Sequence, residues 1–162
     1  MKRSPCSPHR TVCCWNRNTE HPAAYARECL LAVLGEFALP RETVEDLVLA
    51  VSELAANASQ HAPGPYELRV RSGAGELIVE VHDRGQDMPA IPLQLGSPQP
   101  VPADTTGQRL DDLIAQLSER GRGLALVHSL MSGCLSARRT PTGKAVWVAV
   151  GMDTRPTNGT VR

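Results

Sequence analysis

The sequence predicts a single domain of mixed α/β class that contains both helices and β-hairpins. The chain has 162 residues, a length typical of one domain. A hydrophobic fraction of 41% is enough for a domain of this size to bury a core. Apolar residues recur at helical spacing in some segments and alternate with polar residues in others, which predicts helices and strands in one chain.

A strand and two helices are predicted in the first part of the chain. Residues 11–15 are β-branched and aromatic, which favours a strand. Pro22 suits the first turn of a helix, and Pro40 separates that helix from the next one. Residues 42–61 form the second predicted helix. Its core-facing apolar stripe consists of Val44, Leu47, Val48, Val51, Leu54, Ala55 and Ala58.

Two β-hairpins are predicted from alternating apolar residues. The first spans residues 66–83 and turns at residues 73–75, where two glycines flank an alanine. The second spans residues 134–150 and turns at residues 141–143, which read Pro-Thr-Gly. Both hairpins belong to the same predicted domain.

The segment between the hairpins spans residues 86–120. Its first half is rich in proline, which predicts an irregular loop, and apolar residues recur at helical spacing in its second half. The apolar side of its predicted helix consists of Leu110, Leu113, Ile114 and Leu117. Residues 124–131 form a further apolar helix. Residues 1–10 and 153–162 have the composition of flexible tails, so the predicted domain spans residues 11–152.

The composition excludes several classes of partner. The 17 acidic side chains balance 17 basic ones and aromatic residues make up 3%, which argues against a basic nucleic-acid arm or a base-stacking surface. The N-terminal region has no apolar run long enough for a signal peptide or a membrane span. The five cysteines lack the spacing of a disulfide framework. The sequence therefore predicts a cytoplasmic protein without a direct nucleic-acid or membrane partner.

Glu53 and Asn57 are the first polar residues that point to chemistry. They lie four residues apart, on one face of the predicted helix, in a stretch that is otherwise apolar. An amide oxygen suits Mg²⁺, so Asn57 is a candidate metal ligand. A carboxylate one turn earlier, Glu53, is a candidate base for the group that attacks a γ-phosphate.

Later residues suit the remaining parts of a nucleotide. Asp83 ends a predicted strand and can accept a hydrogen bond from an exocyclic amine such as that of adenine, and Gly85 lets the backbone approach the base. Gly121 and Gly123 precede a helix whose free N–H groups favour phosphate, and Gly143 lies in the last turn. Each signal alone has an ordinary explanation, such as a solvated helix face, a turn or a helix cap. Their order along the chain favours a nucleotide site.

In this order the motifs resemble those of the GHKL, or Bergerat-fold, ATP-binding superfamily, and within it the small anti-sigma-factor serine kinases. Residues 51–62, VSELAANASQHA, are similar to the N-box helix of that family. Residues 79–85, VEVHDRG, resemble its adenine-binding motif, and residues 121–127, GRGLALV, its lid-closing glycine motif. Residues 142–147, TGKAVW, resemble its last motif. The resemblance runs from about residue 10 to residue 152.

The resemblance implies a two-layer α/β sandwich of the α+β type, with helices on one face of a mixed, mostly antiparallel sheet. ATP would lie with Mg²⁺ between the N-box helix and a mobile lid at residues 86–120. By position, Glu53 would be the general base, Asn57 the Mg²⁺ ligand and Asp83 the residue that contacts adenine. The other nucleotide-binding positions would be Gly85, Gly121, Arg122, Gly123, Thr142 and Gly143, with Arg122 beside the phosphates.

The sequence departs from the family pattern after Gly143. Many members carry a threonine directly after this glycine, whereas here Lys144 follows it and Thr142 precedes it. The lid is also long and proline-rich for this subfamily. A basic rim, near the phosphates or on the surface adjoining them, is expected from Arg120, Arg122, Arg138, Arg139 and Lys144.

Three functions are compatible with the resemblance. The first is an anti-sigma factor that is also an ATP-dependent serine/threonine kinase, which would phosphorylate an antagonist protein and sequester a sigma factor, with a homodimer as one possible state. The second is a non-catalytic module in which ATP only sets the conformation of the lid. The third, a detached catalytic domain of a sensor histidine kinase, is disfavoured because no upstream helical hairpin with a phospho-accepting histidine is evident.

Overall fold

Five strands form one sheet in the computed structural model, which describes residues 9–89, 123–132 and 134–152. The strands are β1 (Arg10–Trp15), β2 (Tyr66–Gly73), β3 (Glu76–Asp83), β4 (Leu135–Thr140) and β5 (Gly143–Gly151). They lie in the order β1-β2-β3-β5-β4, and every neighbouring pair is antiparallel. The described sheet is therefore wholly antiparallel, whereas the resemblance implied a mixed, mostly antiparallel one.

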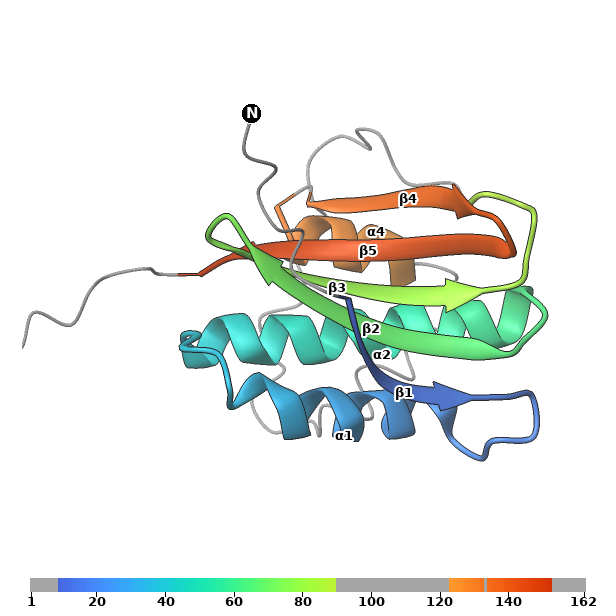
Figure 1. Ribbon diagram of the computed structural model, residues 1–162, viewed down its shortest axis with the longest axis horizontal. Helices are drawn as coiled ribbons and strands as arrows, with labels where there is room; N and C mark the ends of the chain where they lie inside the picture. Colours follow the sequence, from blue (N-terminus) through green and yellow to red (C-terminus); the bar gives the residue numbers. More distant parts are fainter. Residues whose placement is uncertain (1–8, 90–122, 133, 153–162) are drawn as a thin grey trace, which may run out of the picture.

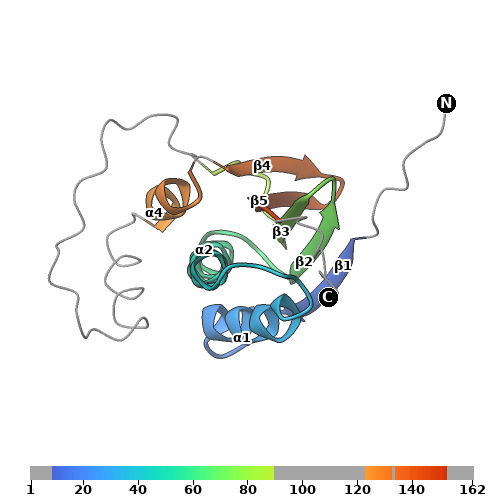
Figure 2. The same ribbon diagram turned by 90° about the vertical axis from the view of Figure 1, so that its left-hand side faces the viewer.

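Helices cover one face of this sheet, and in the described residues they are α1 (Pro22–Leu34), α2 (Arg41–His61) and α4 (Gly123–Leu130). The sheet curves around α2, with α1 and α4 on either side of that helix (Figure 2). In Figure 1, β3, β5 and β4 lie above α2 and α1, whereas β1 lies beside α1. The expected two-layer α/β sandwich is confirmed.

The observed helices and strands lie close to their predicted bounds. Arg10, which the sequence assigned to a flexible tail, is the first residue of β1 and pairs with Val70. The predicted helix around Leu113 and the C-terminal tail at residues 153–162 lie outside the described residues.

The middle of α2 is the centre of the core. Its buried residues are Leu47, Val48, Leu49, Ala50, Val51, Ser52, Glu53, Leu54, Ala55 and Ala58. This run is nearly continuous because the sheet, α1 and α4 all pack against the helix (Figure 2). The inward-facing side chains of β2 and β3, which alternate along each strand, complete the core: Leu68, Val70, Leu77, Val79 and Val81.

Aromatic residues fix the C-terminal end of α2 against the sheet. Trp15 and Tyr66 stack with their ring centroids 5.6 Å apart. The Trp15 indole N–H donates to Ser59 Oγ at 3.0 Å, and the Tyr66 hydroxyl donates to the Ala62 carbonyl oxygen at 2.7 Å. The last turns of α2 are therefore held at the end of the sheet where β1 and β3 end and β2 begins.

The turn between β2 and β3 places an alanine in the left-handed region. Ala74 and Gly75 have φ values of 53° and 79°, as both central residues of a type I′ turn require. An L-residue in this region costs about 1–2 kcal/mol, a cost that glycine does not carry. We expect Ala74→Gly to raise the free energy of unfolding by about 1 kcal/mol, measured by urea denaturation.

The matched control is Ala32→Gly, the same change at an exposed position of α1. Glycine in a helix lowers stability by about 0.5–1 kcal/mol, so the two variants should move in opposite directions. A loss of stability in both would contradict the turn conformation.

Candidate functional site

Asp83, the last residue of β3, is buried on the helix-covered face of the sheet and is 4% exposed. Its Oδ1 atom accepts two hydrogen bonds, one from the Gly85 backbone N–H at 2.7 Å and one from Lys144 Nζ at 2.9 Å. Asp83 and Lys144 are also cross-strand partners in the β3–β5 pairing. The carboxylate is thereby held in one orientation, and its Oδ2 atom takes no part in either bond. This arrangement makes Asp83 a fixed, buried hydrogen-bond acceptor.

Two glycines allow the chain to pack closely around Asp83. A Cβ atom on Gly85 would lie 2.6 Å from Lys144 Nζ and 3.0 Å from the Cβ of Ala62, just beyond the end of α2. A Cβ atom on Gly143 would collide with the backbone carbonyl of Asp83. Packing within the protein therefore already requires glycine at Gly143, where the colliding atoms are backbone, whereas a side chain at Gly85 would displace the Lys144 ammonium.

Glu53 is buried in the middle of α2, with 3% of its surface exposed. A Cβ atom on Gly123 would collide with Glu53 Oε2, so the carboxylate lies directly against the first described residue of α4. A negative charge near the N-terminal end of a helix is stabilised by the helix dipole. Asn57 lies one turn further along α2 and is half-buried. The fold thus brings Glu53 and Gly123 together although 70 positions separate them in the chain.

The start of β5 presents Lys144 to the Asp83 carboxylate, whereas Thr142 lies in the turn before that strand. Thr142 is exposed and lines two shallow cavities of about 330 Å³ and about 230 Å³ together with Arg69 and His82. The contact between Lys144 and Asp83 was not predicted from the sequence. The available signal was the departure from the resembled family pattern at Lys144, directly after Gly143. Gly121 and Arg122 lie outside the described residues.

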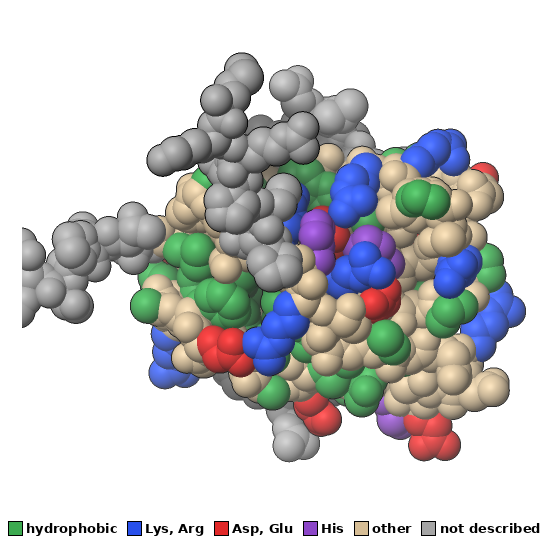
Figure 3. All heavy atoms as spheres, in the orientation of Figure 1, with side chains coloured by type: hydrophobic (Ala, Val, Ile, Leu, Met, Phe, Trp, Pro, Cys, Tyr) green, Lys and Arg blue, Asp and Glu red, His purple; other side chains and the backbone are tan. Residues whose placement is uncertain are grey.

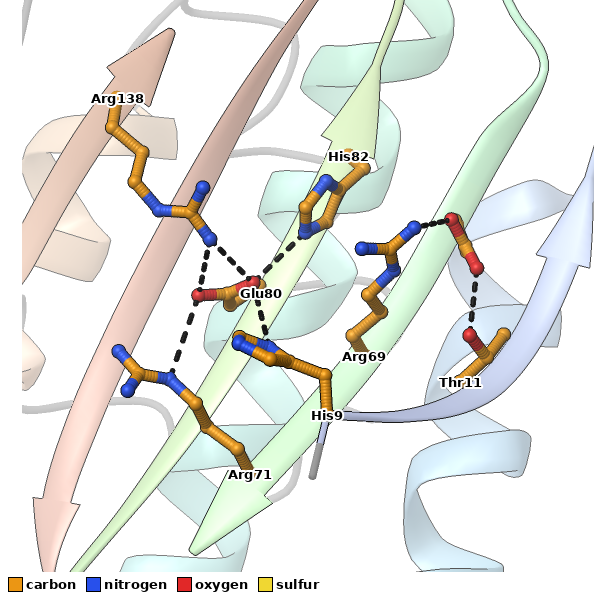
Figure 4. Close-up of polar contacts among 8 residues, drawn as sticks. His9, Thr11, Arg69, Arg71, Glu80, His82 and Arg138 are labelled. Carbon is orange, nitrogen blue, oxygen red and sulfur yellow. Dashed lines mark hydrogen bonds and ion pairs between the residues drawn. The ribbon is translucent and has the colours of Figure 1, made fainter. Parts of the chain in front are cut away.

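The expected basic rim is wrong for Arg138, which lies on the face of the sheet that α1, α2 and α4 do not cover (Figure 4). Lys144 lies on the helix-covered face, beside Asp83. Arg139 donates from Nη1 to the Gln86 carbonyl oxygen at 2.7 Å. Arg120 and Arg122, the other expected members, lie outside the described residues.

A second polar cluster lies on the open face of the sheet, where histidine, arginine and acidic side chains gather (Figure 3). At its centre is Glu80, fully buried among side chains from three strands and from the residue before β1 (Figure 4). Its carboxylate accepts hydrogen bonds from Arg138 at 2.9 and 3.0 Å and lies 2.8 Å from His82 Nε2. Arg71 and His9 approach it at 3.8 Å. The charge of Glu80 is thereby compensated by its cationic neighbours, which is typical of a structural network.

The surroundings of Glu80 change its acidity. Burial acts to raise the pKa of Glu80, but hydrogen bonds from His82 and Arg138 and the charge of Arg138 lower it to about 2, against an ordinary value of 4.5. Because the folded-state pKa is the lower one, the ionised carboxylate stabilises the fold above pH 4.5, and this contribution is lost as the pH falls toward 2.

We expect Glu80→Gln to lower the free energy of unfolding at pH 7 and to make stability less dependent on pH between about 5 and about 2. Urea denaturation across this range measures the difference. Glu76→Gln, a change of an exposed residue on the same strand, should retain the dependence of the wild type. If Glu80→Gln retained it as well, the network would not hold the charge of Glu80.

The described residues show two further features that bear on function. None of their helices is both long and apolar enough to cross a membrane. They also contain no group of three or more histidine, cysteine, aspartate or glutamate side chains arranged to hold a metal ion.

Comparison with known proteins identifies the family. Residues 16–150 match a family model described as a histidine kinase-like ATPase domain. The match includes α2, β3 and α4 and the start of β5, and therefore Glu53, Asp83 and Lys144. A search of curated proteins found no match. Since the matched residues make up most of the chain and carry the whole candidate site, the protein belongs to the histidine kinase-like ATPase family, the ATP-binding GHKL family that its motifs resemble.

Proposed function

We propose that this ATP-binding protein is a cytoplasmic serine/threonine protein kinase of the anti-sigma-factor type. It would phosphorylate an antagonist protein and bind a sigma factor. The observation that supports catalysis is Glu53, a carboxylate kept in the apolar middle of α2 and in contact with the start of α4. A carboxylate that the fold holds in one place is what general-base catalysis requires.

Asp83 is the proposed contact for the adenine base. The 6-amino group of adenine is a hydrogen-bond donor, and Asp83 offers an acceptor that is already oriented by Gly85 and Lys144. Such a fixed acceptor loses little conformational entropy when the base binds. ATP bound here supplies the γ-phosphoryl group that a kinase transfers.

Asn57 is the proposed protein ligand for Mg²⁺. The ion accepts oxygen ligands and usually keeps several waters and substrate phosphate oxygens, so a single amide oxygen from the protein is sufficient. The half-buried Asn57 lies one turn from Glu53 on α2. When bound, the ion would neutralise charge on the phosphates.

Glu53 would act on the protein substrate. It would accept the proton of a serine or threonine hydroxyl as the oxygen of that hydroxyl forms a bond to the γ-phosphorus. The bond from the γ-phosphorus to the β–γ bridging oxygen would break at the same time, and ADP would leave with that oxygen.

An alternative function is a non-catalytic module that associates with partner proteins under the control of ATP. The contact between Glu53 and Gly123 favours this alternative, because a carboxylate at the N-terminal end of α4 also serves as a structural stabiliser of that helix. Loss of phosphoryl transfer on substitution of Glu53 distinguishes the two functions.

Asp83→Asn is expected to weaken ATP binding by about tenfold to a hundredfold, the scale of one hydrogen bond to a charged group. Asparagine keeps a side-chain oxygen for the Gly85 N–H but loses the charge. Isothermal titration calorimetry with ATP and Mg²⁺ measures the effect, and Glu76→Gln, at an exposed position at the other end of β3, is the control. Equal affinity of wild type and Asp83→Asn would exclude Asp83 as the adenine contact.

Glu53→Gln is expected to leave ATP affinity nearly unchanged and to lower phosphoryl transfer about a hundredfold or more. The measurement uses γ-labelled ATP, Mg²⁺ and candidate antagonist proteins from the same genome. Glu42→Gln, on an exposed position of α2, should transfer phosphate like the wild type. Absence of transfer by the wild type to every such protein would favour the binding module.

A further inference from the structure

Lys144 is a buried cation with unused hydrogen-bond donors. Its side chain is 8% exposed, and within the described residues its ammonium makes one hydrogen bond, to Asp83 Oδ1 at 2.9 Å. An ammonium has three N–H donors, so two of them are not used by the part of the chain that the structure describes. A buried polar group without its full set of partners is costly. The position therefore suits a ligand that accepts a hydrogen bond.

The pairing of β3 with β5 places this donor next to an acceptor. Lys144 is the second residue of β5 and lies opposite Asp83, the last residue of β3. The ammonium lies over Gly85, where a Cβ atom would approach it to 2.6 Å. The Asp83 carboxylate and the Lys144 ammonium therefore lie side by side, and Oδ2 is not the oxygen that Lys144 contacts.

The Watson–Crick edge of adenine carries the complementary pair. Its 6-amino group donates a hydrogen bond, and the neighbouring ring nitrogen N1 accepts one. We infer that Lys144 donates to N1 of adenine while Asp83 accepts from the 6-amino group, so that Lys144 is a base-recognition residue of this chain. The inference rests on the proposed ATP site and adds a second base contact to it.

The opposite role, in which Lys144 blocks the site and must leave when ATP binds, fits the contacts less well. Moving the ammonium away would leave Asp83, whose side chain is 2% exposed, without its cation. Separation of a buried ion pair is strongly unfavourable, and a neutral base does not replace the lost charge. An ammonium that stays on Oδ1 and uses its remaining donors on the base avoids this cost.

A nucleotide analogue tests the contact in the wild-type protein. In 1-deaza-ATP a C–H group replaces N1, whereas 7-deaza-ATP changes a different ring position and is the control. We expect wild type to bind 1-deaza-ATP about tenfold to a hundredfold more weakly than ATP, measured by calorimetry with Mg²⁺. The affinity for 7-deaza-ATP should stay close to that for ATP.

Lys144→Met removes the ammonium and keeps much of the length of the side chain. The affinity of this variant for ATP should be lower than that of wild type by about tenfold or more. It should also bind ATP and 1-deaza-ATP with equal affinity. Arg84→Met, a change of an exposed cation beside Asp83, should keep the distinction. If Lys144→Met does not fold, the comparison of ATP with 1-deaza-ATP binding by the wild-type protein still tests the contact.

The outcomes separate this inference from the proposed function. Equal binding of ATP and 1-deaza-ATP by wild type would overturn the role of Lys144 and leave the ATP site intact. Tighter ATP binding by Lys144→Met would show that the lysine blocks the site, and tighter binding of GTP than of ATP would show recognition of a different base. No binding of ATP by wild type would overturn both the inference and the proposed function.

Discussion

The burial of α2 is the constraint on which the rest of the structure depends. This helix is packed by the sheet on one side and by α1 and α4 on the others, so its middle carries an almost unbroken run of buried residues (Figure 2). Trp15 and Tyr66 hold its C-terminal end against the sheet. Within this setting Glu53 is a charged group among apolar ones, and its position is fixed by the same packing that stabilises the fold. A site built on α2 is therefore rigid on one side.

Charged residues lie on both faces of the sheet, in two different arrangements. Along β3, Val81 and Asp83 point toward the helices, whereas Glu80 and His82 point to the open face. On the open face, the charges satisfy one another around Glu80. On the inner face, Asp83 and Lys144 form a pair that keeps one carboxylate oxygen and two N–H donors unused by that pair. The net charge of zero thus hides a network around the compensated carboxylate of Glu80 on one face and the Asp83–Lys144 pair on the other.

Much of the fold follows from local sequence patterns. The alternation of apolar residues in β2 and β3 and the apolar stripe of α2 predicted these elements and the burial of their inner faces. Glu53 and Asn57 were recognisable because a carboxylate and an amide interrupt an apolar helix. The partner of Asp83 was not predictable in this way, since Lys144 lies 61 positions away and meets it only through the register of β3 and β5. Arg138 was misplaced for a related reason: which face a β4 side chain occupies depends on pairing, and β4 has a weak apolar alternation.

The central claim is that the inner-face site formed by α2, β3 and β5 binds ATP through Asp83. A crystal structure of the protein with Mg²⁺ and a non-hydrolysable ATP analogue tests it most directly. The account predicts the 6-amino group of adenine within hydrogen-bond distance of the Asp83 carboxylate and the phosphates toward Asn57 and the start of α4. A nucleotide bound instead on the open face, among Arg69, His82 and Arg138, would contradict it.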